Sequence, residues 1–390
     1  MRIKSLRLIV TVGFIWASLS LPVCADEISD LKANVKSMQN QINMLLNRIE
    51  VLEVEKASRM TTPIEVEDRV LKLEEKMQKP LLSKLANSSF NMKGYIQPYY
   101  KWEEHDSGED TGELKRARLK IYGKWKEDFA GFIQLELAAG SDILRDAVVK
   151  YQHFSWARIA AGQMIVPYSY IDNYPTAKVP TIEFPLIATN LASVRDIGVM
   201  IDGNVLADQL YYAVGIFNGA GQNTSDDNEN KDIVGRVIYS PFKNNENDLL
   251  SGFSVGGNIQ TGRQPLSGNY EGDRNRYGGL LLYNYDKLEV IGEYMYQKRE
   301  RVGFLGDETA QGWYLLGSYK ITSKIKGVVM YEQYDPNMDI SRDQQDILTL
   351  GGTYYFNDYF KIAMDYRQLY EQQSNDDTNN ELIMQATFQF

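Results

Sequence analysis

Hydrophobic and polar residues alternate along short segments from about residue 90 to the C-terminus. In one segment a basic residue stands at every second position, at Arg116, Arg118 and Lys120, with apolar residues between them. A period of two residues predicts β-strands with one polar and one apolar face. Roughly sixteen segments of about ten residues follow this pattern, and that is the length of a tilted strand that crosses a bilayer. They begin near Phe90, Leu114, Phe129, Ile143, Trp156, Arg195, Gln209, Asp232, Gly252, Arg274, Lys287, Gln311, Ile325, Asp346, Phe360 and Glu381.

The connections between these segments alternate in length. The short ones include residues 126–128, 206–208, 285–287 and 357–358, with residues 241–251 as a longer exception. The long, polar ones include residues 103–113, 218–231, 261–273, 298–310, 335–345 and 371–380. Short turns on one side and long loops on the other are typical of an outer-membrane barrel. We therefore expect an all-β transmembrane barrel of about 16 antiparallel strands over residues 90–390, with both of its ends in the periplasm.

A different period runs through residues 26–80. Apolar residues recur there at alternating spacings of three and four. The main seam consists of Ile28, Leu31, Val35, Met38, Ile42, Leu45, Ile49 and Leu52. β-branched residues at position a with Leu or Met at d favour two chains, whereas Leu46 at an e position suits three. We expect a periplasmic α-helical coiled coil over residues 26–80 and a linker over 81–89, with a single amphipathic helix as the alternative.

The first 25 residues have the organisation of a secretory signal peptide. A basic start precedes an apolar stretch over residues 8–21, and a small-residue cleavage site ends at Ala25. We therefore expect residues 1–25 to be removed and the remainder to be exported. Lipidation of Cys24 is the alternative, which the bulky Val23 disfavours. Because Cys24 is the only cysteine, neither a disulfide nor thiol chemistry is expected in the exported chain.

Composition narrows the classes of function. The net charge of -10 argues against nucleic-acid binding. A mean hydropathy of -0.39 is compatible with a membrane barrel, because polar residues facing the lumen alternate with apolar residues facing lipid. The 26 Tyr and 30 Gly fit aromatic girdles and many tight turns. A barrel of about sixteen strands leaves an aqueous channel, so the passage of solutes is the function that the pattern favours.

The longest connection runs from Val166 to Val194 and is rich in proline and tyrosine. Long links in compact folds are usually functional. We expect this one to fold into the barrel and narrow the channel, with a surface cap on a trimer face as the alternative. Its candidate constriction residues are Tyr168, Tyr170, Tyr174, Lys178, Glu183 and Phe184.

The alternation also predicts which charged side chains line the pore. The candidates are Arg116, Arg118, Lys120, Glu136, Asp146, Lys150, Arg158, Arg195, Asp196, Asp202 and Arg236. Opposed rows of acidic and basic groups would create a transverse field across the channel. In the alternative interpretation the same groups pair directly and stiffen the wall. Arg116, Arg118 and Lys120 are the best candidates for an anion-contacting strip, because three like charges on one face need an anion or solvent nearby.

Catalysis has little support in the sequence. The only histidines are His105, in an acidic loop, and His153, beside a predicted turn. Neither can be combined with a serine and an acid, and no metal-ligand or phosphate-loop motif is present. We expect no enzymatic activity, no cofactor and no metal.

Several motifs resemble the phosphate-selective porin O and P family. They are Lys115-Arg116-Ala117-Arg118-Leu119, Asp146-Ala147-Val148-Val149-Lys150-Tyr151, Gly162-Gln163-Met164-Ile165-Val166-Pro167-Tyr168-Ser169 and Arg195-Asp196-Ile197-Gly198. The resemblance spans about residues 90–390 and implies a sixteen-stranded trimeric porin whose third external loop folds inward. A coiled coil ahead of the barrel is similar to arrangements in related trimeric porins. The terminal Phe390 resembles the aromatic end that barrel-assembly machinery uses.

These observations lead to the expectation of a porin in the cell outer membrane. It would allow passive diffusion of small hydrophilic solutes, with anions such as phosphate among them. The alternative is a structural anchor that tethers the cell wall through the coiled coil. The family's phosphate-selective members have a dense arginine ladder and lysine cluster, whereas the long connection here offers only Lys178. The expected partners are outer-membrane lipid, lipopolysaccharide, two further copies of the chain, barrel-assembly machinery and the solute.

Overall fold

The structure is a computed structural model that describes two separate parts of the chain. It describes residues 88–390 except for 105–109, 193–194, 227–228, 246, 268–269, 304–305 and 372–379, together with a few residues between 36 and 48 that are helical. The predicted signal peptide and the residues of the heptad seam lie outside the described residues. Within the part described, no helix is long and apolar enough to span a membrane.

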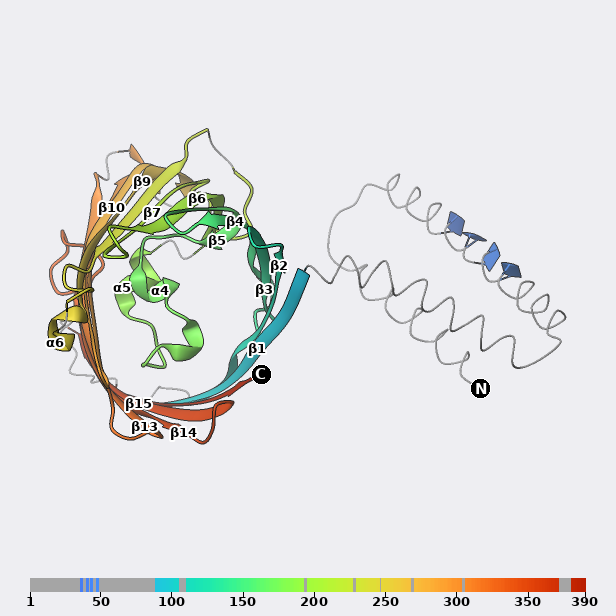
Figure 1. Cartoon of the computed structure of the whole chain (residues 1–390). Helices are drawn as coiled ribbons and strands as arrows, with labels where there is room; N and C mark the ends of the chain where they lie inside the picture. The colour runs from blue at the N-terminus through green and yellow to red at the C-terminus, as the bar shows by residue number, and fades with distance from the viewer. Residues whose placement is uncertain are drawn as a thin grey trace. The chain divides into compact units, whose positions relative to one another are not determined.

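Residues 88–390 form a closed antiparallel barrel in which each strand pairs with its neighbours in sequence and β1 pairs with β16 (Figure 1). The sixteen strands of the described part are β1 (Ser88–Glu103), β2 (Thr111–Trp125), β3 (Phe129–Glu136), β4 (Leu144–Phe154), β5 (Ala157–Ile165), β6 (Arg195–Val205), β7 (Leu210–Phe217), β8 (Asp232–Tyr239), β9 (Phe253–Ser267), β10 (Tyr270–Tyr285), β11 (Leu288–Arg301), β12 (Glu308–Lys320), β13 (Ile325–Asp335), β14 (Gln345–Tyr355), β15 (Phe360–Glu371) and β16 (Glu381–Gln389). Closure leaves no unpaired sheet edge.

The predicted strand starts lie within four residues of those in the structure. The prediction of a long loop over residues 261–273 was wrong, because β9 continues to Ser267 and β10 begins at Tyr270. Likewise, β11 continues to Arg301 and shortens the connection predicted at 298–310. These strand ends were predicted as loops because their side chains are polar. A strand that projects beyond a membrane no longer needs an apolar outer face.

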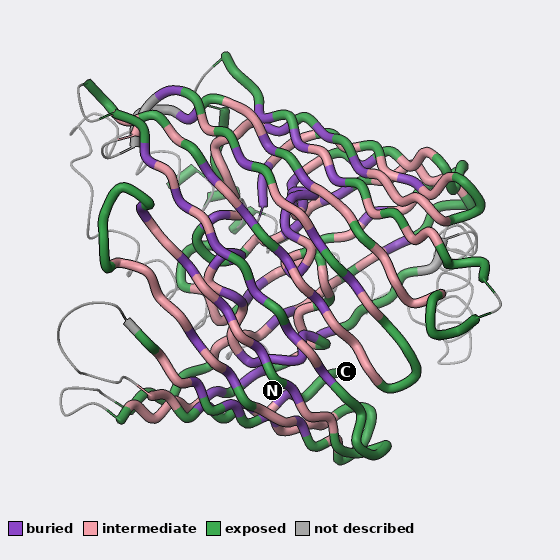
Figure 2. The backbone as a smooth tube through the Cα atoms, turned by 90° about the vertical axis from the view of Figure 1, so that its left-hand side faces the viewer, coloured by how far each residue is buried: buried purple, intermediate pink, exposed green. Residues whose placement is uncertain are grey.

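The two faces of the barrel wall differ in the way that the alternation predicts. Large apolar side chains point outward and are exposed, as with Val149 (62 %), Val199 (51 %) and Val329 (52 %). Inward positions carry buried polar groups such as Glu136 and Gln260. Figure 2 shows the resulting alternation of buried and exposed stretches along the tilted strands. An apolar outer surface around a polar interior is the arrangement of a transmembrane barrel.

Residues 166–192 of the connection between β5 and β6 lie inside the ring of strands and are called the inward loop below (Figure 1). It contains α4 (Tyr170–Asn173), the short 3-10 helix η1 (Thr176–Lys178) and α5 (Leu186–Leu191). Ile171, Ile187 and Leu191 are almost fully buried and belong to the main apolar cluster, and α5 packs against β11, β12 and β13. The alternative of a surface cap does not describe this loop.

A glycine at position 162 permits the close approach of β5 to β4. Gly162 has a φ of +122°, and a Cβ atom there would lie 2.1 Å from the Ala147 carbonyl oxygen. Only glycine adopts this backbone conformation readily. The next residue, Gln163, donates to the carbonyl oxygen of Arg145 at 2.8 Å and accepts from the Asn223 N–H at 2.7 Å. These bonds attach the long β7–β8 connection to the outer ends of β4 and β5.

Candidate functional site in the barrel lumen

Glu293 on β11 holds the first part of the inward loop. Its carboxylate accepts the backbone N–H of Tyr170 at 2.7 Å and the hydroxyl of Tyr314 at 3.1 Å, and it is only 3 % exposed. Nearby, Asn258 on β9 donates to the carbonyl oxygen of Tyr168 at 2.7 Å, and Arg236 on β8 donates to that of Ser169 at 3.1 Å. The wall therefore satisfies the buried backbone groups of Tyr168, Ser169 and Tyr170 that are named here.

Three further carboxylates of the wall accept hydrogen bonds from later parts of the loop. Glu289 accepts the Tyr174 hydroxyl at 2.6 Å. Asp365 accepts the Ile182 N–H at 2.7 Å, and Glu332 accepts the Leu186 N–H at 2.5 Å. Because β11, β13 and β15 all contribute, the loop is held along one side of the lumen. Hydrogen bonds to ionised acceptors are stronger than neutral ones, so this attachment is firm.

The loop divides the lumen into a closed and an open side. On the closed side, a pocket with only about 10 Å³ of free space lies where residues 179–182 and Phe184 face β1, β2, β14, β15 and β16. On the open side, a cavity of about 760 Å³ lies between residues 173–177 of the loop and strands β1–β6. We call this space the main cavity. It reaches the turn at Asp358 and Tyr359, which belongs to the short-turn end of the barrel.

Basic side chains outnumber acidic ones around the main cavity. The basic residues are Lys93, Arg118, Lys120, Lys150 and Arg195, and the acidic residues are Asp146 and Asp358. Within the described residues, Lys120 and Lys150 have no carboxylate at ion-pair distance. Unpaired cations in a confined space attract and retain anions.

An aromatic ring stands between these two lysines. Phe132 lies on β3, which separates β2 and β4 in the sheet. The Nζ atom of Lys120 is 3.7 Å from the centroid of the Phe132 ring, and that of Lys150 is 5.6 Å from it. Such distances allow cation–π attraction, which orients the lysine side chains. The ring therefore helps to keep both ammonium groups at the wall of the main cavity.

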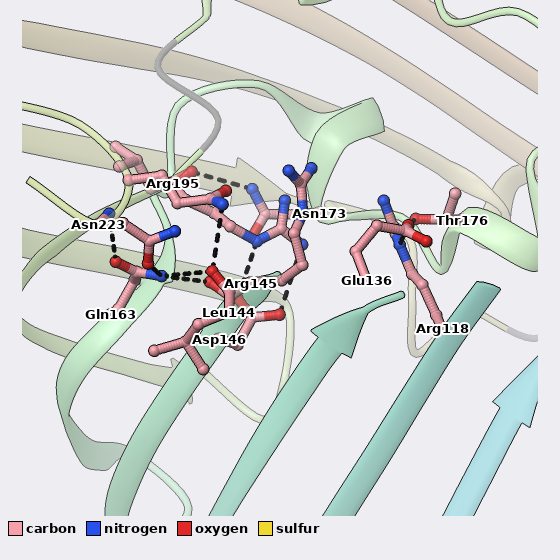
Figure 3. Close-up of polar contacts among 12 residues, drawn as sticks. Arg118, Glu136, Leu144, Arg145, Asp146, Gln163, Asn173, Thr176, Arg195 and Asn223 are labelled. Carbon is pink, nitrogen blue, oxygen red and sulfur yellow. Dashed lines mark hydrogen bonds and ion pairs between the residues drawn. The ribbon is translucent and has the colours of Figure 1, made fainter. Parts of the chain in front are cut away.

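Several of the charged residues predicted from the sequence form direct pairs. Arg118 Nε lies 2.7 Å from Glu136, and Arg195 Nε lies 3.1 Å from Asp146. Figure 3 shows both pairs, with Asn173 and Thr176 of the inward loop nearby. Arg118 also donates to the Thr176 hydroxyl at 3.0 Å. These residues therefore form direct ion pairs and not the opposed rows of acidic and basic groups that would create a transverse field.

The remaining charged candidates have structural partners of other kinds. Arg158 and Asp202 form an ion pair away from the main cavity. Asp196 accepts the Gly219 N–H at 2.6 Å and thereby holds the β7–β8 connection. Arg116 does not line the main cavity, since it donates to Gln97 at 3.3 Å and faces the Phe184 ring on the closed side. Of the predicted strip, only Arg118 and Lys120 face the main cavity.

The loop residues predicted at a constriction have diverse environments. Tyr168 is fully buried and Tyr170 is half-buried, so neither offers much surface to a solute. Tyr174 lines the main cavity, whereas Lys178 is exposed at the end of η1. Glu183 forms an ion pair with Lys115 of β2. Burial would raise the pKa of Glu183, but the charge of Lys115 outweighs it, so the pKa lies below its usual range.

Asp172 in α4 is the least satisfied charged group of the inward loop. Its Oδ2 atom is buried without a hydrogen-bond partner. Burial raises the pKa of the Asp172 carboxyl to about 7, and the nearby Glu293 carboxylate adds to the rise. Arg195 and a hydrogen bond with Ser169 oppose it. The group therefore changes its protonation near neutral pH.

Sequence reasoning missed most of the loop attachments. It assigned no role to Glu289, Glu332 or Asn258, and it overlooked Phe132. All four occupy inward positions of their strands, so the alternation located them but did not reveal their partners. The sequence did contain one signal for such a role. An inward carboxylate that has no basic residue opposite it on a neighbouring strand is free to accept hydrogen bonds from the loop.

The family model for phosphate-selective porin O and P matches residues 90–390, which is the whole barrel. The chain belongs to the phosphate-selective porin O and P family. Members of this family are channels of the outer membrane, and the closed barrel with an inward loop agrees with that. No curated protein sequence matches this porin.

Three solved structures show the same fold as this porin O and P family member at low sequence identity. An anion-selective porin from Comamonas acidovorans has a TM-score of 0.62 and 14% identity, over 78% of this chain and 100% of that one. OmpT of Vibrio cholerae in its trimer form has a TM-score of 0.59 and 11% identity, over 78% of this chain and 99% of that one. OmpF of Salmonella typhi in complex with daunomycin has a TM-score of 0.57 and 15% identity, over 78% of this chain and 98% of that one.

Proposed function

We propose that this porin is a passive channel with a weak preference for anions, and that solutes cross it through the main cavity. The observation that carries the proposal is the unequal charge of the cavity wall, with five basic side chains against two acidic ones. Lys120 and Lys150 contribute most, because no carboxylate neutralises them within the described residues. The similarity of the fold to an anion-selective porin agrees with this preference.

In this proposal the inward loop sets the narrowest part of the channel. Residues 173–177 line the main cavity together with Lys120 and Arg195, and Thr176 contacts Arg118 directly. Small hydrophilic solutes pass by diffusion, and a positive wall raises the local concentration of anions. Phosphate belongs to this class, but the wall has no dense row of unpaired arginines that would select it, since Arg118 and Arg195 are paired.

We also propose that the barrel assembles as a homotrimer in the outer membrane. Strands β3, β5, β7 and β8 have only eight or nine residues, whereas β9 and β10 have fifteen and sixteen. The outer faces of the short strands carry exposed apolar side chains such as Ile133 and Ile159, which suits contact with a neighbouring barrel. A porin of similar fold forms trimers. The mass of the detergent-solubilised protein tests this.

The charge preference is tested by the reversal potential of single channels in a tenfold gradient of KCl. We expect a chloride preference of about threefold for the natural protein. The double variant Lys120→Glu and Lys150→Glu should favour potassium, because the wall would then be negative. The matched control is Lys243→Glu with Lys324→Glu, which changes exposed turn residues outside the cavity. A natural protein that prefers potassium would contradict the anion preference, and a protein without conductance would contradict the channel.

A further inference from the structure

The wall of the main cavity is apolar as well as basic. Each strand from β3 to β6 contributes an apolar side chain to the lining of the cavity, and these are Phe132, Val148, Met164 and Met200. Phe132 and Met200 are partly exposed and offer most of the apolar surface, whereas Val148 and Met164 are only 3 % and 5 % exposed. The pairing of the strands places Phe132 opposite Val148, and Met200 opposite the buried Ala160 of β5. The side chains therefore form a continuous band across four strands, which we call the apolar strip.

The apolar strip lies next to the unpaired cations. Lys120 and Lys150 flank Phe132 from the strands on either side of it. Tyr95 and Tyr174 add aromatic surface from β1 and from the inward loop. An anion held by the two ammonium groups would therefore have its remaining atoms beside the strip.

This combination discriminates between kinds of anion. Inorganic phosphate and chloride have no apolar surface and gain nothing from contact with methionine or phenylalanine side chains. An anion with an aromatic body gains from apolar burial and from ring-to-ring contact with Phe132. A cavity of about 760 Å³ is large enough for a single-ring compound.

We propose that the main cavity favours organic anions with an aromatic body, such as ring carboxylates, over small inorganic anions. The carboxylate binds between Lys120 and Lys150, and the ring lies along the apolar strip. This inference rests on the proposed anion-preferring channel and names its preferred class of solute. Solutes of this class occupy the cavity longer than chloride and so reduce the chloride current while they are present.

The experiment measures block of the single-channel chloride current by benzoate, acetate and inorganic phosphate at pH 7.5 and constant ionic strength. We expect half-block by benzoate at a concentration about fivefold lower than by acetate or phosphate. Phe132→Leu should remove most of this advantage, and Lys120→Gln should weaken block by benzoate. The control is Phe129→Leu on the same strand, which changes an outward residue that is 48 % exposed and should keep the advantage.

The possible outcomes separate this inference from the proposal on which it rests. If chloride is preferred over potassium but benzoate blocks no better than acetate, the apolar strip does not select solutes and the inference fails. The inference also fails if Phe132→Leu and Phe129→Leu reduce the advantage equally. If the natural channel shows no preference for chloride, the proposed function itself fails, whatever benzoate does.

Discussion

Acidic and basic side chains have different roles on the two sides of the lumen. On the side of β11, β13 and β15, acidic side chains accept hydrogen bonds from the inward loop and are buried, as with Glu293 and Asp365. On the side of β1–β6, Arg118 and Arg195 are paired, but Lys120 and Lys150 line the main cavity and have no acidic partner within the described residues. The acids are part of the structure, while these bases remain available to solutes.

This difference explains how an acidic protein can have a positively charged passage. The chain has a net charge of -10, and that sum includes carboxylates that are bound to the loop and hidden from the channel. A buried carboxylate that accepts several hydrogen bonds contributes little potential to a distant solute, because nearby dipoles compensate its charge. The charge that a solute meets is set by the few side chains at the cavity wall.

Removal of the inward loop should change the difference between the two sides of the lumen more than any other substitution. We expect replacement of residues 175–185 by a short Gly-Ser linker to raise single-channel conductance roughly threefold, because it opens the closed side of the lumen. The chloride preference should fall as well, since the carboxylates of β13 and β15 would then face water. Unchanged conductance in planar bilayers would show that the loop does not narrow the channel.

A second prediction compares one residue from each side. Glu293→Leu should lower the free energy of unfolding by about 3 kcal/mol, because it leaves the Tyr170 N–H and the Tyr314 hydroxyl buried without an acceptor. Lys150→Met on the open side should change it by less than about 0.5 kcal/mol. Urea unfolding in detergent measures both, and Glu293→Gln separates loss of charge from loss of hydrogen bonds. If Glu293→Leu and Lys150→Met changed the free energy of unfolding equally, the acidic side chains would not have the structural role proposed here.

Most of the barrel, but little of the loop attachment, could be predicted from the sequence. The period of two residues located all sixteen strands of the described part, because each strand must satisfy a lipid-facing and a water-facing side. The short turn at 126–128 also fixes the register of β2 and β3 and so brings Arg118 opposite Glu136. That ion pair was therefore within reach of sequence reasoning.

Other contacts depend on how the chain returns to the same place after a long interval. Glu293 is more than one hundred residues from Tyr170, and Arg195 is separated from Asp146 by β5 and the inward loop. No local pattern relates such residues, since only closure of the barrel brings them together. For the same reason the division of the lumen into a closed and an open side was not predictable.

The smallest predicted effect concerns Asp172, which lies in the loop between the two sides. Its pKa is raised from the ordinary value of 3.8 to about 7, so the carboxyl takes up a proton on folding when the pH lies between these values. Stability should therefore fall as the pH rises from about 4 to about 7 and stay lower above that. Asp172→Asn removes the ionisation and should raise the free energy of unfolding at pH 8 by about 2 kcal/mol, with little effect at pH 4. The control is Asp339→Asn, which changes an exposed residue of an outer loop and should leave stability unaltered at both pH values. If Asp172→Asn raised the free energy of unfolding equally at pH 4 and pH 8, the gain would not come from removing a buried negative charge. The inward loop would then tolerate a charge at this position as readily as the open side of the lumen does.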